Sequence, residues 1–368
     1  MRRAAPEIST GTVPGFGPGF GPGFGPGPGR LRLCVVSSVG GHLREVLELA
    51  PAWAGAEVGF IVNDHTEVPL PGPVHRIAHA ERDARVLWNL LEAARIFGRT
   101  GPGGGRPDVI LSAGAGPAVP VALVGRLVGA AVVFVETFGA VERPSLSGRL
   151  LYPLTPHFFY QWPALARFYP RGRYAGPVFR RLPAAELPPP GGEIVVTVGT
   201  SSRPFDRLLR WLDELADSGE LTAPLFAQHG ASVAPRRFPG SAFLPAPELE
   251  ARLGRARLVI CHAGAGALGT CIKYGLRPLV VPRLGRYGEA VNDHQLELAR
   301  ALAAQGRAVL CPDRAALLTA LRTALATPHG GRLTSEAAPS GELLKEVAAL
   351  LARLAAARGK SLGEPPPL

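Results

Sequence analysis

The sequence predicts an α/β protein of two domains, each with a parallel sheet, that face each other across a central cleft. Short apolar runs alternate with helical patterns along the chain, which is typical of parallel strands joined by right-handed crossovers. The 368 residues are enough for two domains of about 150 residues each. A proline-rich linker, LPAAELPPPGG at 182–192, separates the two series. Ligands of such folds bind where the strands end, so the cleft is the expected site.

Composition narrows the classes of partner. The net charge of +11 suits nucleic acid, an anionic membrane surface or a phosphorylated substrate, and equally a simple excess of arginine. Because the chain has no dense Lys/Arg run and no nucleic-acid module, we expect no nucleic-acid partner. Its four cysteines form no CxxC pair, so we expect no metal site, no disulfide framework and a cytoplasmic location. Neither a secretory signal nor a transmembrane helix is predicted.

The first domain is expected over 30–181, after a Gly/Pro/Phe-rich tail, 1–29, that cannot build a core. Apolar runs of strand length and apolar residues at helical spacing define its elements, with glycine and proline at the breaks. In order they are strand Leu31–Val36, loop Ser37–His42, helix Leu43–Trp53, strand Val58–Val62, helix Ala84–Phe97, break Gly101–Pro107, strand Val109–Leu111, helix Pro117–Leu127, and strands Ala131–Val135 and His157–Gln161.

The second domain is expected over 193–358, followed by a tail at 359–368. The same patterns predict strands Ile194–Val198, Leu225–Gln228, Leu258–Cys261, Pro278–Val281 and Ala308–Leu310. The helices between and after them are expected at Asp206–Leu215, Glu248–Leu253, after the glycine loop at 262–266, from Asn292 onward, at Ala315–Leu325 and at Leu343–Ala357.

The segment SSVGGH, after the first strand, is a candidate anion site. Gly40 and Gly41 permit a tight strand-to-helix turn and close backbone approach. The N-terminus of the following helix can hold a phosphate group. His42 can donate to an anion or act as a base. The alternative is a turn in which His42 only caps the helix.

Two further groups in the first half follow strands. Ser112, Gly114 and Gly116 form either a second face of the acceptor site or only a compact turn. Glu136 ends an apolar strand, so its carboxylate is expected on the floor of the cleft. Partial desolvation there would raise its pKa toward that of a general base, and a salt bridge to a nearby arginine is the alternative.

The second half carries the candidates for binding a nucleotide diphosphate and its sugar. Hydroxyls and backbone amides after a strand suit a diphosphate. The group at 199–201 equally suits an N-cap run for the helix that follows it. A polar cluster at a helix start suits the hydroxyls of a sugar, or only a solvated helix end. The diphosphate candidates are Gly199, Thr200, Ser201, His262, Gly264, Ala265, Gly266 and Ala267, and the sugar candidates are Asn292, Asp293, His294 and Gln295.

These motifs together resemble a known family. VTVGTSSRPFDRLL, HAGAGALGTCIKYGLRPLVVPRLGRYGE and DHQLELA are similar to the donor-binding half of glycosyltransferase family 28, most of all to its PssE-type subunits. SSVGGHLREVLEL, SAGAGPAVPVA, VETFGAVERPSLSGRLLYPL and FFYQWP resemble the PssD-type partner and its eukaryotic dolichol-linked N-acetylglucosaminyltransferase relatives. The resemblance covers about 31–325, with both subunits fused in a MurG-like layout.

The resemblance implies a GT-B fold of two Rossmann-like domains and inverting, metal-independent transfer from a UDP-sugar to a polyprenyl-diphosphate-linked glycan in exopolysaccharide or glycoconjugate biosynthesis. It implies no cofactor and peripheral contact with the inner face of the plasma membrane. Glu136 matches the family's proposed base, and His42 is the alternative base or a ligand of the acceptor diphosphate. The implied donor residues include the candidates above together with Phe243, Leu244, Thr270 and Glu289.

The chain departs from the family pattern in the donor half. Ala267 and Thr270 stand where the family usually has serine and a ribose-binding glutamate, and Ser201 and Ser202 replace a common His-Glu pair. Fewer donor contacts imply altered nucleotide affinity or donor preference. Other hypotheses are a glycosyltransferase acting on a soluble natural product, a nucleotide-sugar epimerase, whose motifs are missing, and a non-catalytic sugar-nucleotide-binding or scaffold protein.

Overall fold

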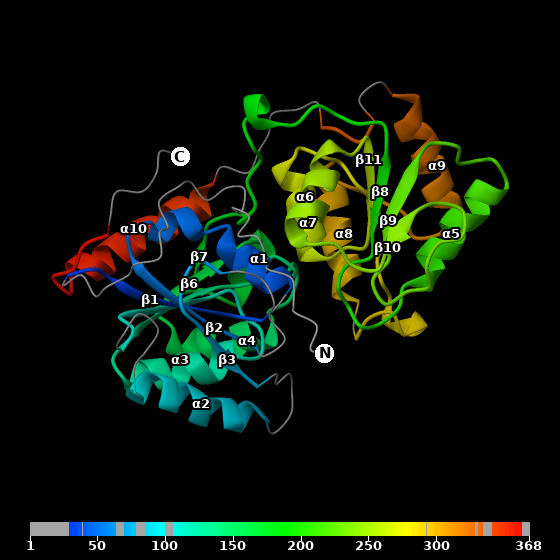
Figure 1. Cartoon of the computed structure of the whole chain (residues 1–368). Helices are drawn as coiled ribbons and strands as arrows, with labels where there is room; N and C mark the ends of the chain where they lie inside the picture. Colours follow the sequence, from blue (N-terminus) through cyan, green and yellow to red (C-terminus); the bar gives the residue numbers. More distant parts are fainter. Residues whose placement is uncertain are drawn as a thin grey trace, which may run out of the picture.

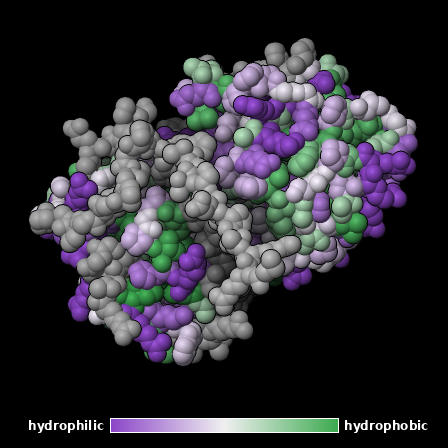
Figure 2. Space-filling model, in the orientation of Figure 1, coloured by the Kyte–Doolittle hydropathy of each residue, from purple (hydrophilic) through white to green (hydrophobic). Residues whose placement is uncertain are grey.

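The computed structural model describes residues 29–38, 40–63, 70–78, 85–99, 106–291, 293–327, 330–333 and 341–362. They form two lobes, each a parallel sheet covered by helices (Figure 1). The predicted α/β fold with two parallel sheets is therefore confirmed. On the face shown in Figure 2, hydrophilic residues are spread over the outer surface of the second lobe, between smaller hydrophobic patches.

The first sheet has seven strands in the order β3-β2-β1-β4-β5-β6-β7, all paired in parallel. Its strands are β1 (Arg32–Ser37), β2 (Glu57–Asn63), β3 (Val74–Ile77), β4 (Val109–Ser112), β5 (Ala131–Val135), β6 (His157–Tyr160) and β7 (Arg173–Tyr174). The helices of this lobe are α1 (Gly41–Leu47), α2 (Arg85–Arg99), α3 (Ala118–Leu127) and α4 (Leu146–Leu151), with 3₁₀ turns η1 (Ala50–Trp53), η2 (Tyr152–Leu154) and η3 (Pro163–Arg167).

The second sheet has six parallel strands in the order β10-β9-β8-β11-β12-β13. They are β8 (Ile194–Thr197), β9 (Leu225–Gln228), β10 (Gly240–Ser241), β11 (Leu258–Cys261), β12 (Leu279–Val280) and β13 (Val309–Leu310). The helices are α5 (Asp206–Asp217), α6 (Ala246–Arg255), α7 (Ala265–Lys273), α8 (His294–Ala304) and α9 (Arg314–Ala326), with 3₁₀ turns η4 (Ala184–Glu186) in the linker and η5 (Gly285–Tyr287) after β12. Figure 1 shows α6 and α7 on the side that faces the first lobe.

Both sheets reverse their strand order at a point that places the glycine loops. In the first sheet the order reverses between β1 and β4, which are followed by the loops at 38–40 and 113–117. In the second it reverses between β8 and β11, which are followed by the loops at 198–205 and 262–264. Connections leave such a point in opposite directions, so a crevice forms there and ligands bind in it.

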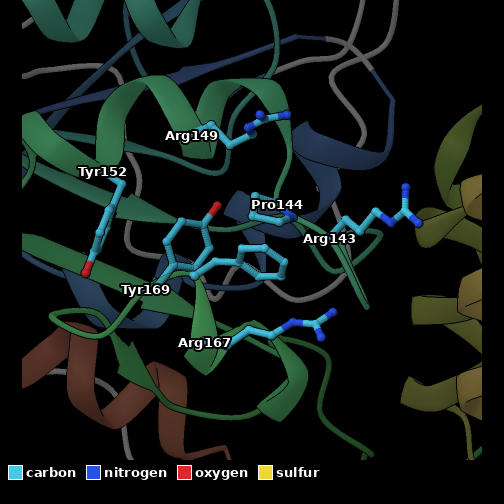
Figure 3. A pocket seen from close by; sticks show the side chains of 7 residues that line it. Arg143, Pro144, Arg149, Tyr152, Arg167 and Tyr169 are labelled. Atoms are coloured by element: carbon cyan, nitrogen blue, oxygen red, sulfur yellow. The ribbon is translucent and has the colours of Figure 1, made fainter.

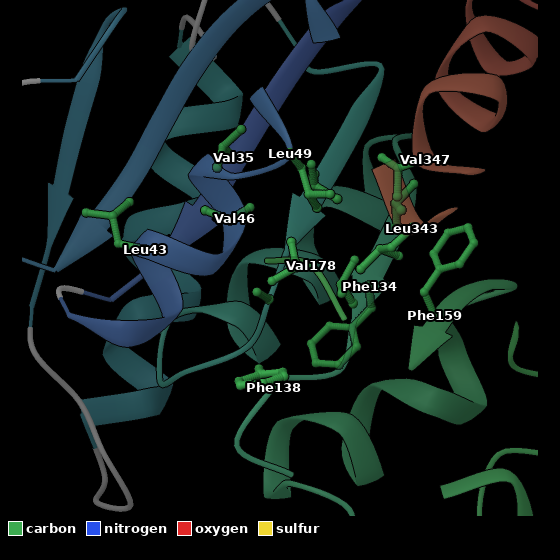
Figure 4. Close-up of a cluster of buried hydrophobic side chains, with 14 of the residues drawn as sticks. Val35, Leu43, Val46, Leu49, Phe134, Phe138, Phe159, Val178, Leu343 and Val347 are labelled. Atoms are coloured by element: carbon green, nitrogen blue, oxygen red, sulfur yellow. The ribbon is translucent and has the colours of Figure 1, made fainter. Parts of the chain in front are cut away.

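The helix that ends the described chain, α10 (Glu342–Ala356), corrects the predicted domain boundary. We assigned it to the second domain, 193–358, but it packs on η1 of the first lobe. Its apolar side, including Leu343 and Val347, is buried with Phe134 and Phe159 of the first sheet (Figure 4). An amphipathic pattern predicts that one face of a helix is buried, but it does not predict which domain covers that face.

Local predictions also need correction. The single helix predicted at Leu43–Trp53 is α1 followed by η1, because Pro51 has no N–H to continue the α-helical bonding and sits instead at the start of a 3₁₀ turn. The sequence analysis missed the short elements β3, β7, β10 and α4. The predicted tail at 1–29 lies outside the described residues except for Gly29. Within the described part of the chain, no helix is long and apolar enough to cross a membrane.

Packing between the lobes predicts a stability effect at Gly269. A Cβ there would overlap the ring of Phe179, which joins the first lobe to α7. We expect Gly269→Ala to destabilise the protein by about 1–3 kcal/mol through this overlap. Gly98, in α2, has open space around its Cα, so Gly98→Ala is expected to stabilise by about 0.5–1 kcal/mol. Denaturant unfolding of both variants checks the two signs, and an unchanged Gly269→Ala midpoint would contradict the packing argument.

Candidate active site

Two helix N-termini, one from each lobe, meet at the interface. A Cβ built on Gly41, the first residue of α1, would lie 3.6 Å from the Ala265 Cβ and 3.8 Å from the Gly266 nitrogen of α7. The N-caps are Gly40 and Gly264, and among the described residues no side chain caps either helix. Each end carries backbone N–H groups without intrahelical partners and a partial positive charge. The arrangement therefore suits an anion held between the lobes.

An ion-pair network holds these two helices together. Arg44 of α1 donates to Glu250 of α6 (2.5 Å), and Lys273 of α7 donates to the same carboxylate (2.7 Å). Burial alone would raise the pKa of Glu250, but its hydrogen bonds and the charges of Arg44 and Lys273 lower it to about 2. The carboxylate is thus ionised at neutral pH and bridges the lobes beside the glycine loops.

His42 lies at the start of α1, partly exposed. Its Nδ1 is 3.0 Å from the Ala113 carbonyl oxygen, so in the tautomer that this contact favours Nδ1 donates and Nε2 is left as an acceptor. Burial lowers the pKa of the imidazole below its usual value. His42 is therefore neutral at physiological pH, and the ring is oriented by the loop after β4.

Glu136 directly follows β5, as predicted, but its side chain is enclosed, with an exposed fraction of 0%. Its carboxylate accepts hydrogen bonds from the N–H groups of Thr137 (3.0 Å) and Ser145 (3.2 Å), and from the Tyr169 hydroxyl. These partners occupy it, and not Arg143 or Arg149, the salt-bridge partners considered as the alternative. Burial raises its pKa above the usual range. The backbone of α4 passes so close that a Cβ on Gly148 would overlap the carboxylate.

A second buried carboxylate, Glu45 of α1, was missed by the sequence analysis. It accepts from the Thr137 hydroxyl (2.8 Å), the Phe138 N–H (2.8 Å) and the Gln161 amide (3.3 Å). Burial raises the pKa of Glu45 to about 8, and the nearby Glu136 adds to the effect. Glu45 therefore fixes the segment Glu136–Phe138, called here the ETF segment, to the helix that carries His42.

The loop after β4 serves as a scaffold. The Ser112 hydroxyl is buried and donates to the Val36 carbonyl (2.8 Å), so it is occupied within the fold. Gly114 has φ 103° and lies against the His42 ring, while Gly116 is half-buried. Ala115 has φ 77°, which is unfavourable for a residue with a Cβ, and its carbonyl accepts from Ser147 of α4 (3.3 Å). The loop thus connects His42 to α4.

In the second lobe the glycine loops pack around His262. A Cβ on Gly199 or on Gly264 would overlap the imidazole ring, which explains why both positions lack a side chain. The ring is fixed by a contact between Nδ1 and the Thr197 carbonyl (3.3 Å). Burial and the charge of Arg283 lower the pKa of His262 to about 4. His262 is therefore a neutral spacer between the two loops.

Arg283, a further residue that the sequence analysis missed, pins the loop after β8. Its guanidinium is buried and donates to the carbonyls of Val198 (2.7 Å) and Arg203 (2.7 Å). Its backbone N–H donates to Gln295 (3.1 Å), so that predicted sugar ligand is engaged within the fold. Only the VVPR pattern in the sequence pointed to this arginine, and it gave no hint of the contacts.

Three other predicted donor residues make polar contacts within the protein. Glu289 is buried and paired with Arg207 (2.8 Å). The Thr270 hydroxyl donates to the Gly266 carbonyl of its own helix (3.0 Å). Asp293 is exposed and accepts from the Gly285 N–H (2.9 Å).

The remaining donor candidates lie at the surface or beside it. Exposed or partly exposed are Thr200, Ser201, Phe243, Leu244, Ala267 and His294, and Asn292 lies outside the described residues. Among the residues that the structure describes, no group of His, Cys, Asp or Glu side chains is arranged to hold a metal ion.

Both halves of the chain match known families. Residues 84–178 match the family of oligosaccharide biosynthesis protein Alg14-like sequences, and residues 194–349 match the glycosyltransferase family 28 C-terminal domain. The UDP-N-acetylglucosamine transferase subunit ALG14 of Rattus norvegicus is 29% identical over 183 residues, covering 40% of this chain and 82% of that protein. The Schizosaccharomyces pombe subunit alg14 is 43% identical over 77 residues, covering 20% of this chain and 37% of that protein.

Solved structures share the fold. MurG of Acinetobacter baumannii aligns with a TM-score of 0.51 and 20% identity, covering 87% of this chain and 94% of that one. The glycosyltransferase of kitacinnamycin aligns with a TM-score of 0.55 and 17% identity, covering 91% and 97%. The predicted GT-B architecture is therefore confirmed, whereas the roles of single residues stay predictions.

The buried Glu45 predicts a pH dependence of stability. Its pKa of about 8 in the folded state lies above the value of about 4.3 expected when unfolded. The native state thus favours the protonated acid, and its contribution to stability is lost as pH rises from about 4 through 8. We expect Glu45→Gln to lose less stability than the parent over this range, as measured by thermal unfolding at several pH values. The exposed Glu142→Gln is the control, and parallel curves for Glu45→Gln and the parent would contradict the prediction.

Proposed function

Because residues 194–349 match the glycosyltransferase family 28 C-terminal domain and residues 84–178 match the Alg14-like family, we propose that the chain transfers a hexose-type sugar from a UDP-sugar to a polyprenyl-diphosphate-linked glycan. Transfer inverts the anomeric carbon and uses no metal. The acceptor belongs to polysaccharide or glycoconjugate assembly at a membrane surface that the protein contacts from one side. The names of the ALG14 relatives, which refer to UDP-N-acetylglucosamine transfer, support a donor of this kind.

The observation that carries this proposal is the meeting of α1 and α7 at Gly41 and Ala265. Two positive helix ends that meet attract a negative group placed beside their contact. A nucleotide diphosphate has that charge, and its sugar would then project from the second lobe toward the first. Developing negative charge on the leaving UDP would be stabilised by the same N–H groups.

His42 is our proposed general base. Its Nε2 takes the proton of the acceptor hydroxyl, the oxygen attacks the anomeric carbon, and the bond from that carbon to UDP breaks. Glu136, the base that the resemblance implied, is instead proposed to act by positioning, because its carboxylate is enclosed by Tyr169 and α4. Glu45 and Ala113 would hold His42 and the ETF segment in register.

The function is tested with the purified chain, a panel of UDP-sugars and a lipid-linked acceptor. We expect UDP release and labelled glycolipid with one donor, and both should require the acceptor. Transfer to a soluble acceptor alone would favour a natural-product enzyme. Binding of UDP without transfer under any condition would favour a non-catalytic protein, and either result would contradict the proposal.

Substitution of the two candidate bases separates their roles. We expect His42→Ala to lower kcat by about 10²–10⁴ with UDP binding unchanged, as is typical for loss of a general base. Glu136→Gln should reduce the rate less, because it retains hydrogen bonding to Tyr169. The control is His75→Ala, on the distant edge strand β3. Full activity in His42→Ala together with inactive Glu136→Gln would assign the base to Glu136 instead.

A further inference from the structure

A pocket of about 500 Å³ lies in the first lobe beside the buried Glu136 (Figure 3). It is lined by three arginines, Arg143, Arg149 and Arg167, and by three aromatic rings, Tyr152, Phe168 and Tyr169. In Figure 3, Arg149 and Arg167 lie on opposite sides of the Tyr169 ring, and Arg143 extends from a third side. The cavity is thus surrounded by cationic groups over an aromatic floor.

The floor is rigid. Tyr169 is 1% exposed, and its ring packs on those of Tyr152 (centroids 4.9 Å apart) and Phe158 (4.4 Å). Its hydroxyl is held by the Glu136 carboxylate beneath. Such support keeps the walls in place before a ligand arrives, which lowers the entropy cost of binding.

The three guanidinium groups are available to a ligand. All three arginines are exposed, and within the described part of the chain no ion pair joins any of them to a carboxylate. Arg167 donates only to the Glu142 backbone carbonyl (3.3 Å). From Arg143 to Arg181 the sequence contains no aspartate or glutamate. An anion with several oxygens, such as a phosphate or diphosphate, matches this set because guanidinium groups bind it in a bidentate way.

Exposed leucines, called here the leucine rim, adjoin the lining residues of the pocket along the chain. Leu146 and Leu150 are 49% and 50% exposed and lie on one side of α4, next to Arg149. Leu154 and Phe168, 38% and 40% exposed, extend this apolar character along the segments that form the other walls. Exposed leucines beside arginines are typical of surfaces that enter a lipid interface. A free phosphate would not need them, whereas a lipid that carries a phosphate could contact both the arginines and the leucines.

The pocket is joined to the proposed reaction site through α4. Ser147, two residues before Arg149, contacts the Ala115 carbonyl in the loop that packs on His42. We propose that the three-arginine pocket binds the diphosphate of the lipid-linked acceptor, with its polyprenyl chain over the leucine rim and its sugar toward His42. This inference rests on the proposed function and identifies the subsite that binds the lipid-linked acceptor.

The test measures binding to phosphatidylcholine vesicles that contain a polyprenyl diphosphate. We expect Arg149→Ala and Arg167→Ala each to weaken binding by about tenfold or more, since each removes hydrogen bonds to a charged group. Arg149→Lys should recover only part of the loss. The matched control is Arg171→Ala, which removes an equal charge next to the pocket, where Arg171 stacks on Tyr152 outside the lining. It should change binding by less than about twofold.

Further measurements distinguish the lipid-linked diphosphate from other sources of phosphate, and acceptor binding from donor binding. Inorganic diphosphate should compete poorly, and vesicles with phosphatidylglycerol in place of the polyprenyl lipid should bind poorly. In the transfer assay the pocket variants should raise KM for the lipid acceptor and leave KM for the UDP-sugar unchanged. Equal losses in Arg171→Ala and the pocket variants, or strong competition by inorganic diphosphate, would overturn the inference. Vesicle binding needs no turnover, so inactivity of the parent chain would contradict only the proposed function.

Discussion

The contact between the N-termini of α1 and α7 is the constraint on which the rest of the structure depends. Two helix ends of like sign approach because Gly41 and Gly266 have no side chains to separate them. The approach is stabilised from outside by Glu250, which accepts from Arg44 of one lobe and Lys273 of the other. Attraction between these charges offsets the repulsion of the dipoles, and an anion placed between the helix ends would add to it. The lobes therefore meet where backbone N–H groups converge.

Behind that contact the first lobe contains two carboxylates that are costly to bury. Glu136 lies close enough to Glu45 to raise the pKa of the Glu45 carboxyl further. Each is satisfied by several donors, and together they bind both sides of the short segment at Thr137 and Phe138. Such a network favours a single arrangement of these segments, because a buried polar group left without a hydrogen-bond partner would cost more free energy than one that is paired. The network thereby fixes the position of α1, which carries His42, relative to α4, which carries Arg149.

The sequence alone predicted the sheets and the loops that follow β1, β4, β8 and β11, because glycine at the end of an apolar strand is a local signal. It did not predict which polar residues are free. Glu289 was expected to meet the donor but is paired with Arg207, and Arg283 was not singled out although it holds the loop at 198–203. These outcomes depend on contacts between residues far apart in the chain. The position of α10 was missed for the same reason, since its apolar face fits either lobe until the sheets are folded.

The path of the chain gives the interface a second support. The linker leads from the first lobe into β8, and the chain returns before α10, so two segments cross between the lobes. They are bonded to each other, since Arg332 of the returning segment donates to the Pro188 carbonyl of the linker (3.1 Å). The linker is also bonded to α7, where the Leu182 N–H donates to the Lys273 carbonyl (2.8 Å). Two bonded crossings restrict rotation of one lobe against the other more than a single linker does.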